Sequence, residues 1–203
     1  MRKHVLTALS CAALLMVTCT ACAQQKADTS AADSSTGQEA THIASPENGW
    51  TPETLLNASS LCGVPFAYPL TLNVLGENFK LDTKDYTLSK EGYVIASLEY
   101  KDGHSCGVSL ESKSVDEIDG DTPIIFLMFA GDDFPEGAVR INSITQGSSC
   151  DEVRAALGEP AEGSDENGTW VYYFQDAPKD EFVRVLFNDG KVSALVLNWK
   201  PMQ

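Results

Sequence analysis

The amino-acid sequence predicts an α+β fold in which short helices pack on antiparallel β-sheet. Residues 149–158 carry the start and stop signals of a short helix, and three runs of alternating apolar residues follow between residues 169 and 199. Residues 70–144 show the same order of signals more faintly. Because tight turns separate the runs, we expect neighbouring strands to pair antiparallel.

Residues 1–21 have the pattern of a lipoprotein signal peptide. Arg2 and Lys3 precede an apolar run from Val5 to Val17. As a helix this run would cover only about 20 Å, which is too short for the roughly 30 Å hydrocarbon core of a bilayer. A basic start followed by a short apolar segment is instead typical of an export signal.

Cys22 is the predicted lipid attachment site, which would anchor the chain in the cell membrane on its extracytoplasmic side. Lipoprotein processing requires a small residue before the cysteine, and Ala21 meets this requirement. Cys19 replaces the usual leucine of this signal, and Cys19 could itself be acylated instead. Ala21 to Ala23 also fits the A-x-A site of an ordinary signal peptidase, which would release a soluble secreted protein.

The composition of residues 22–49 predicts a disordered tether between the lipid and the folded part. The segment is rich in Ser, Thr, Ala, Gln and Asp and almost free of large apolar residues. Such a composition cannot bury enough apolar surface to offset the entropy that ordering would cost. We expect the chain after this tether to fold in two α+β halves, residues 50–140 and residues 141–203.

The charge of the chain narrows the range of partners. Lys and Arg number 14 against 29 Asp and Glu, which gives a net charge of −15. Nucleic acid and anionic phospholipid headgroups would be repelled, so neither is expected to bind. A basic protein or cations are compatible with this charge, and so is an acidic surface that only keeps the chain in solution.

Three cysteines fall in the expected folded part, namely Cys62, Cys106 and Cys150. In an oxidising compartment they could form one disulfide and leave one free thiol, and their spacing leaves the pairing open. A single bridge is not a disulfide framework, so we expect the hydrophobic core to supply the stability.

The clearest local signal is the helix that begins after Ser149. The Ser149 side chain and the Glu152 carboxylate are spaced to form a capping box. Gly158 occupies the position of a left-handed residue after the last turn, and Pro160 prevents continuation. The sequence therefore predicts a helix of about two turns.

Alternating apolar residues predict three strands after this helix and three in the first half. Trp170 follows Tyr93 by 77 residues, and Phe182 follows Ser105 by the same interval. We interpret this spacing as a tandem repeat of a helix plus three strands, with chance β spacing as the alternative. The expected strands are 93–100, 105–111, 123–130, 169–175, 181–187 and 191–199.

The second half carries a recognisable set of motifs. In order along the chain, these are Ile144 to Val153, Leu157 to Pro160, Trp170 to Tyr172, Val185 to Phe187, and Asp189 to Val192. This pattern over residues 141–197 resembles the SmpA/OmlA (BamE-like) lipoproteins and the wider group of folds similar to the β-lactamase inhibitor protein. The resemblance implies a non-enzymatic role in envelope assembly or protein binding. It does not identify a partner.

The search for chemistry yields one weak candidate. His104 and Cys106 are two residues apart and would share a strand face. No local signature of a nucleophilic cysteine surrounds them, so an enzyme that uses this pair is only an alternative. The acidic stretch 116–121 does not match the EF-hand register. We expect no catalytic residue, cofactor or metal site.

A binding surface is the better candidate. In the last three strands, one set of alternate residues would face the helix, and the other set would face outward. Aromatic residues with an arginine are typical of interface hot spots. The first-half sheet or a second copy of the chain could cover this surface instead. The candidate partner-binding residues are Val171, Tyr173, Phe182, Arg184 and Leu186.

These observations predict a membrane-anchored lipoprotein that acts outside the cytoplasm as a protein-binding or envelope-assembly module. A secreted or anchored inhibitor of a hydrolase is the first alternative. An enzyme using His104 and Cys106 is the second.

Overall fold

The computed structural model describes residues 43–131, 134–135, 137–164 and 168–199. The predicted signal peptide, Cys22 and the tether up to residue 42 lie outside these residues. No helix in the described ranges is both long enough and apolar enough to cross a membrane.

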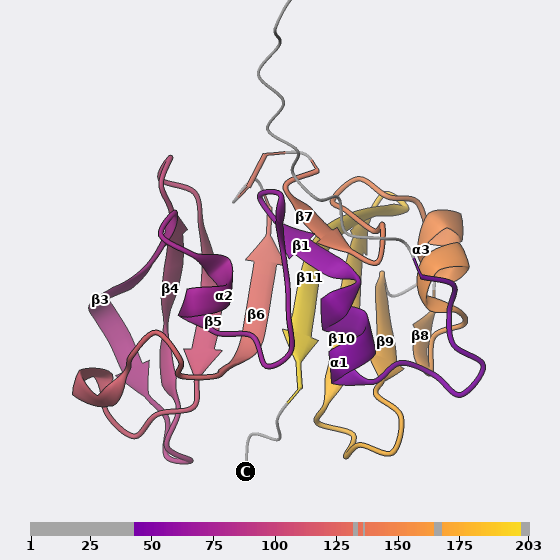
Figure 1. The fold of residues 1–203 in the computed structure, drawn as a ribbon. Helices are drawn as coiled ribbons and strands as arrows, with labels where there is room; N and C mark the ends of the chain where they lie inside the picture. Colours follow the sequence, from indigo (N-terminus) through magenta and orange to yellow (C-terminus); the bar gives the residue numbers. More distant parts are fainter. Residues whose placement is uncertain (1–42, 132–133, 136, 165–167, 200–203) are drawn as a thin grey trace, which may run out of the picture. The chain divides into compact units, whose positions relative to one another are not determined.

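An eight-stranded antiparallel sheet dominates the described chain (Figure 1). This confirms the expected combination of antiparallel sheet with few short helices. In spatial order the strands are β3 (Phe79–Leu88), β4 (Val94–Tyr100), β5 (Ser105–Leu110), β6 (Ile124–Ala130), β11 (Lys191–Asn198), β10 (Phe182–Asn188), β9 (Thr169–Tyr173) and β8 (Glu162–Ser164).

The strand order joins the two halves of the chain edge to edge. Strands β3 to β6 follow in sequence order, and β11 to β8 follow in reverse order, so that β6 and β11 pair at the centre. Leu127 lies opposite Leu197 in this central pair, and Phe129 lies opposite Leu195. Each half contributes four strands where three were expected. The additional strands are the two edges, β3 and β8.

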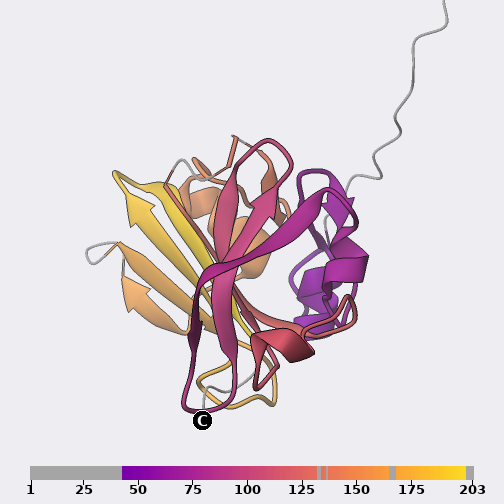
Figure 2. The same ribbon diagram turned by 90° about the vertical axis from the view of Figure 1, so that its left-hand side faces the viewer.

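The remaining elements cover one face of this sheet, as the two views in Figures 1 and 2 show. A small antiparallel sheet of order β2-β1-β7 lies among them. The elements that cover the large sheet are α1 (Pro52–Asn57), β1 (Ser59–Leu61), β2 (Val64–Pro65), α2 (Leu72–Leu75), η1 (Val115–Glu117), β7 (Val139–Ile141) and α3 (Cys150–Leu157).

A single hydrophobic core fills the space between the large sheet and the elements that cover it. Trp170, Leu127 and Leu195 point into it from the sheet and are fully buried. Helix α3 contributes Val153 and Leu157 from the other side. The core therefore runs through both halves of the chain.

Helix α3 begins as predicted. The Glu152 amide donates to Ser149 Oγ over 3.3 Å, and the Ser149 amide donates to Glu152 Oε2 over 2.6 Å. These two bonds form the expected capping box. Gly158 ends the helix with φ +89° and ψ −165°, which differs from the expected left-handed helical conformation. This extended conformation with positive φ is open essentially to glycine alone.

The folded part begins before residue 50, which corrects the expected end of the tether. The Ile43 amide donates to Asn142 Oδ1 over 2.8 Å, and Asn142 Nδ2 donates to the Ile43 carbonyl over 2.7 Å. Ser45 Oγ donates to the Leu157 carbonyl over 3.1 Å at the end of α3. Residues 43–49 therefore belong to the folded part, because distant residues bind the backbone of Ile43 and the side chain of Ser45.

Candidate partner-binding face

Strands β9 and β10 separate the predicted residues onto two faces. Trp170 and Val185 lie opposite each other and are fully buried under the helices. Val171 lies opposite Arg184, and Tyr173 lies opposite Phe182, on the other face. Leu186, two residues from Arg184, shares that face. The five candidate residues are thus brought together as expected.

Strands β11 and β6 extend this surface beyond the predicted residues. Val196 lies between Arg184 on β10 and Met128 on β6. Met128 exposes 42% of its surface. We call the resulting surface the outer face. It comprises Phe126, Met128, Val171, Tyr173, Phe182, Arg184, Leu186 and Val196.

Residue pairing places one continuous row on this side of all eight strands. Its β8 to β6 part is mostly apolar, whereas the part on β4 and β3 is polar, as expected for a sheet face in water. Lys80 and Glu99, which lie opposite each other, belong to that polar part. The full row is Glu162, Val171, Arg184, Val196, Met128, Gly107, Ser97 and Asp82.

The first-half sheet does not cover the outer face. It was a stated alternative that the N-terminal strands would pack over these residues. They instead extend the same sheet through the pairing of β6 with β11. The described helices lie on the opposite side (Figures 1 and 2). Within the described ranges, the outer face is therefore left open to solvent.

Arg184 stands in the middle of this apolar surface. Its guanidinium carbon lies 4.7 Å from the centre of the Phe182 ring, a stacking distance for a cation and an aromatic ring. Its neighbours across the strands are Val171 and Val196. No described carboxylate forms an ion pair with it.

Glu162, the nearer of the two carboxylates in the row of Arg184, is already occupied. Glu162 receives a hydrogen bond from the Tyr173 hydroxyl and lies 3.3 Å from Lys179 Nζ. These two partners hold the pKa of Glu162 below its ordinary value. The same hydrogen bond raises the pKa of the Tyr173 hydroxyl. Glu162 is also two strands from Arg184, which corresponds to roughly 10 Å.

His104 and Cys106 lie in different surroundings. The His104 ring stacks on Phe134 with 5.9 Å between ring centres, and its Nε2 lies 3.9 Å from the Asp102 carboxylate. Cys106 is 3% exposed and lies opposite Leu98 on the core side of β5. Neither residue lines any of the three hollows described on the surface of this part of the chain.

None of the three cysteines in the described residues forms a disulfide. Burial, reinforced by the nearby Asp102 carboxylate, raises the pKa of the Cys62 thiol to about 11. This thiol is therefore protonated at neutral pH and is a poor nucleophile. Cys150 lies in the first turn of α3, where its sulfur is 3.8 Å from the Gly190 carbonyl oxygen.

The acidic stretch 116–121 serves the local structure. Asp119 Oδ1 accepts hydrogen bonds from the Asp121 amide and the Thr122 hydroxyl, at 3.0 Å and 3.1 Å. Asp121 Oδ1 accepts from Asn73 Nδ2 over 2.7 Å and so ties this loop to α2. No group of three or more potential metal ligands converges within the described residues.

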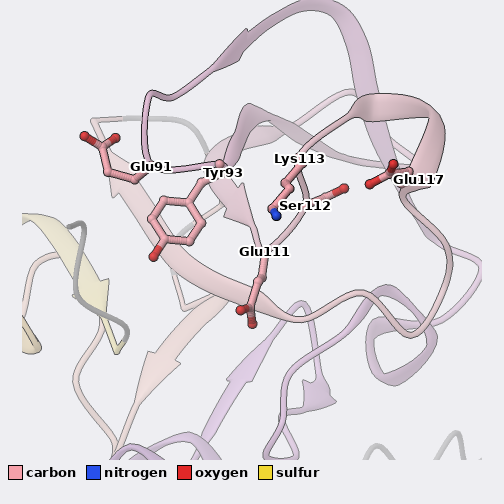
Figure 3. A pocket seen from close by; sticks show the side chains of 7 residues that line it. Glu91, Tyr93, Glu111, Ser112, Lys113 and Glu117 are labelled. Carbon is pink, nitrogen blue, oxygen red and sulfur yellow. The ribbon is translucent and has the colours of Figure 1, made fainter.

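The largest of the described hollows, about 480 Å³, lies where the turn before β4 meets the loop after β5 (Figure 3). Glu91 and Glu117 stand at its two ends, with Tyr93 and Lys113 between them. Its lining contains three carboxylates and one ammonium, with no histidine or cysteine. It is lined by Glu91, Gly92, Tyr93, Glu111, Ser112, Lys113 and Glu117.

Sequence reasoning missed the part of the outer face that β6 and β11 supply. Ile124–Ala130 is a continuous apolar run, and so is most of Lys191–Asn198. Neither run shows the alternation that would assign its residues to two faces.

Comparison with other proteins does not assign a function to this surface, because the chain matches no protein-family description, no curated protein and no solved structure.

Proposed function

We propose that this protein is a non-enzymatic binding module that holds a protein partner on its outer face. In this proposal the chain is anchored through a lipid on Cys22 and acts outside the cytoplasm, in envelope assembly or another binding role. The observation that carries the proposal is the open, largely apolar surface over β9, β10, β11 and β6. Met128 and Val196 at its centre come from the two halves of the chain.

The proposal is supported by the free energy that it costs to expose apolar surface to water. A solvent-facing side of an antiparallel sheet is normally polar, as Asp82, Ser97 and Glu99 on β3 and β4 are here. Tyr173, Phe182, Leu186 and Met128 instead present apolar and aromatic groups to water. Contiguous apolar surface of this kind marks interaction sites. A partner that covers it would gain the free energy of burying it.

A second candidate follows from the arrangement of the two halves. Helices α2 and α3 start at the hydroxyl caps Thr71 and Ser149 and end at Gly76 and Gly158. The two glycines have nearly the same backbone angles, φ +81° and ψ −177° against φ +89° and ψ −165°. Each helix precedes four strands of the sheet.

We infer from this correspondence a tandem repeat of a helix plus four strands, one strand more than the sequence suggested. The resemblance of residues 141–197 to SmpA/OmlA-like and β-lactamase-inhibitor-like domains is consistent with such a repeat. It supports a secreted or anchored inhibitor of a hydrolase as the second candidate. The inhibitor and the assembly module differ in the identity of the protein that they bind.

The enzyme alternative with His104 and Cys106 has less support. A nucleophilic cysteine requires a thiolate and access to substrate. Cys106 is buried in the core cluster, and the His104 ring packs on Phe134. Exchange of both residues without loss of any phenotype would remove this alternative.

Photocrosslinking in intact cells tests the proposed function. A photoreactive benzophenone amino acid replaces Val171, Leu186 or Met128 on the outer face, one at a time. Matched control proteins carry it at Glu53 on α1 or Asp151 on α3, which are exposed on the opposite side. We expect one recurrent protein adduct from the outer-face positions alone. Equal adducts from both sides, or none from the outer face, would contradict the proposal.

The same adduct separates the two candidates. If the crosslinked protein is a hydrolase, its activity should fall as this protein is added up to equal molar concentration. If it is a membrane or envelope-assembly protein, no activity should be inhibited, and cells lacking this protein should show an envelope assembly defect.

A further inference from the structure

We propose that Arg184 selects the partner by binding a carboxylate, so that the outer face receives an acidic segment flanked by apolar side chains. This inference rests on the proposed function and adds the chemistry of the partner. A basic partner is what the net charge of −15 would favour. The local geometry around Arg184 points to the opposite charge.

The first argument is the isolation of this guanidinium. Two cations of the described chain, Arg154 and Lys179, form ion pairs with carboxylates. Arg154 lies 3.8 Å from Asp151 and 3.5 Å from Glu159, and Lys179 lies 3.3 Å from Glu162. Among the described residues, no carboxylate forms an ion pair with Arg184, although the sequence contains 29 acidic residues.

The second argument is that Arg184 is held in place. Stacking on Phe182 at 4.7 Å limits the orientations of the planar guanidinium. Val171 and Val196 flank it on both neighbouring strands. A guanidinium that is already oriented loses little freedom when it binds, and its parallel N–H groups fit the two oxygens of a carboxylate.

The third argument concerns what happens when the face is covered. A partner that buries the surrounding apolar residues also removes water from Arg184. An unpaired buried charge is strongly unfavourable, so the partner must supply an anion at this point. Such an anion would be an aspartate or glutamate side chain, or a C-terminal carboxylate, in an otherwise apolar protein segment. A partner with lysine or arginine at this place would be rejected.

The test measures how Arg184 substitutions change crosslinking from the benzophenone placed at Leu186. Arg184→Gln removes the charge, and Arg184→Glu reverses it. Arg184→Lys keeps the charge but lacks the parallel N–H donors of the guanidinium. Arg140→Gln, at an exposed position on β7, is the control that loses the same charge elsewhere. The crosslinked partner peptide is also sequenced.

We expect Arg184→Gln to lower the adduct yield at least tenfold and Arg184→Glu to lower it further. Arg184→Lys should keep an intermediate yield, and Arg140→Gln should change it less than twofold. The partner peptide should contain Asp, Glu or a C-terminus within a few residues of the crosslink. Unchanged yields in the Arg184 variants, or a basic or uncharged peptide, would overturn this inference and leave the proposed function standing. Absence of any adduct with wild-type Arg184 would overturn both.

Discussion

Asn142 binds the backbone of Ile43 in the manner of a neighbouring strand, although 99 residues separate them in the chain. Its Oδ1 accepts from the Ile43 amide, and its Nδ2 donates to the Ile43 carbonyl and to the Ala156 carbonyl. The Asn142 residue is fully buried and has a φ of +44°. One side chain thus links the start of the folded part, the turn after β7 and the end of α3.

Removal of this side chain should destabilise the protein. Asn142→Gly keeps the positive φ accessible but leaves the Ile43 and Ala156 groups without their partner. We expect the free energy of unfolding to fall by about 2–3 kcal/mol, because one buried and two part-buried polar groups lose their hydrogen bonds. Denaturant unfolding measures this change.

The control for this experiment is Asn57→Ala. The Asn57 side chain accepts one exposed hydrogen bond from the Tyr68 amide. Its loss should cost about 0.5 kcal/mol, as is usual at exposed positions. Equal effects of the two substitutions would show that Asn142 does not hold the N-terminal segment in place.

Gly158 ends α3 in a conformation that other residues avoid. Gly158→Val should lower the free energy of unfolding by about 2 kcal/mol or more, because φ +89° is strained for a side chain with Cβ. A Cβ at this position would also lie 3.1 Å from Ser45 Oγ. Thermal unfolding checks this expectation.

Gly107→Ala is the matched control for Gly158. Gly107 lies on β5 without a positive φ, and an added Cβ would meet the Met128 side chain at ordinary contact distances of 3.5 Å and 3.6 Å. The melting temperature should change little. A melting temperature of Gly158→Val equal to that of the wild type would mean that the helix does not depend on this glycine.

The capping box of α3 should respond to pH. Hydrogen bonds from the Ser149 amide and then the Ser149 hydroxyl lower the pKa of Glu152 in the folded protein. A lowered folded-state pKa contributes stability above the ordinary glutamate pKa, and this stability is lost as pH falls through the lowered value. Glu152→Gln should therefore be less stable than wild type at pH 7, and the difference should shrink under acid conditions.

Two further variants complete this test of the cap. Ser149→Ala should cost about 1 kcal/mol at neutral pH, which is typical for loss of an N-cap hydroxyl. Glu77→Gln, at an exposed position outside the helices, should show no comparable pH-dependent difference from wild type. A Glu152→Gln penalty that is constant from pH 7 to pH 3 would argue against the carboxylate as the capping group.

Cys22→Ala tests the predicted anchor, which lies outside the described residues. Without the acylated thiol, the protein should move from the membrane fraction to the soluble fraction. Cys19→Ala should leave it in the membrane fraction, because Cys22 is the expected attachment site. Retention of Cys22→Ala in the membrane together with release of Cys19→Ala would assign the lipid to Cys19.

Local signals explain why the second half could be predicted. Ser149 and Glu152, the two partners of the α3 cap, lie within four residues of each other. The alternation of side chains along a strand assigns Val171 and Arg184 to one face without knowledge of distant contacts. The cap of α1 was also visible, since Thr51 precedes Pro52. It was missed because six helical residues are too few to show an apolar period.

Other features depend on contacts that no local pattern contains. Residues 43–49 have a composition typical of disordered segments, and their contacts to Asn142 and the Leu157 carbonyl come from residues about 100 positions away. The breadth of the outer face depends on the pairing of Met128 with Val196, which are 68 positions apart. The edge strand β3 alternates poorly because most of its residues are exposed.

The most direct test of the outer face as a recognition surface compares two adjacent residues of β6. Met128 points outward with 42% of its surface exposed, and Leu127 points into the core and is fully buried. Met128→Asn should keep the free energy of unfolding within about 1 kcal/mol of wild type and lower crosslinking from Val171 about tenfold. Leu127→Asn should lose roughly 3 kcal/mol or more of stability. A Met128→Asn protein that unfolds as easily as Leu127→Asn, or one that captures its partner as well as wild type, would contradict this account.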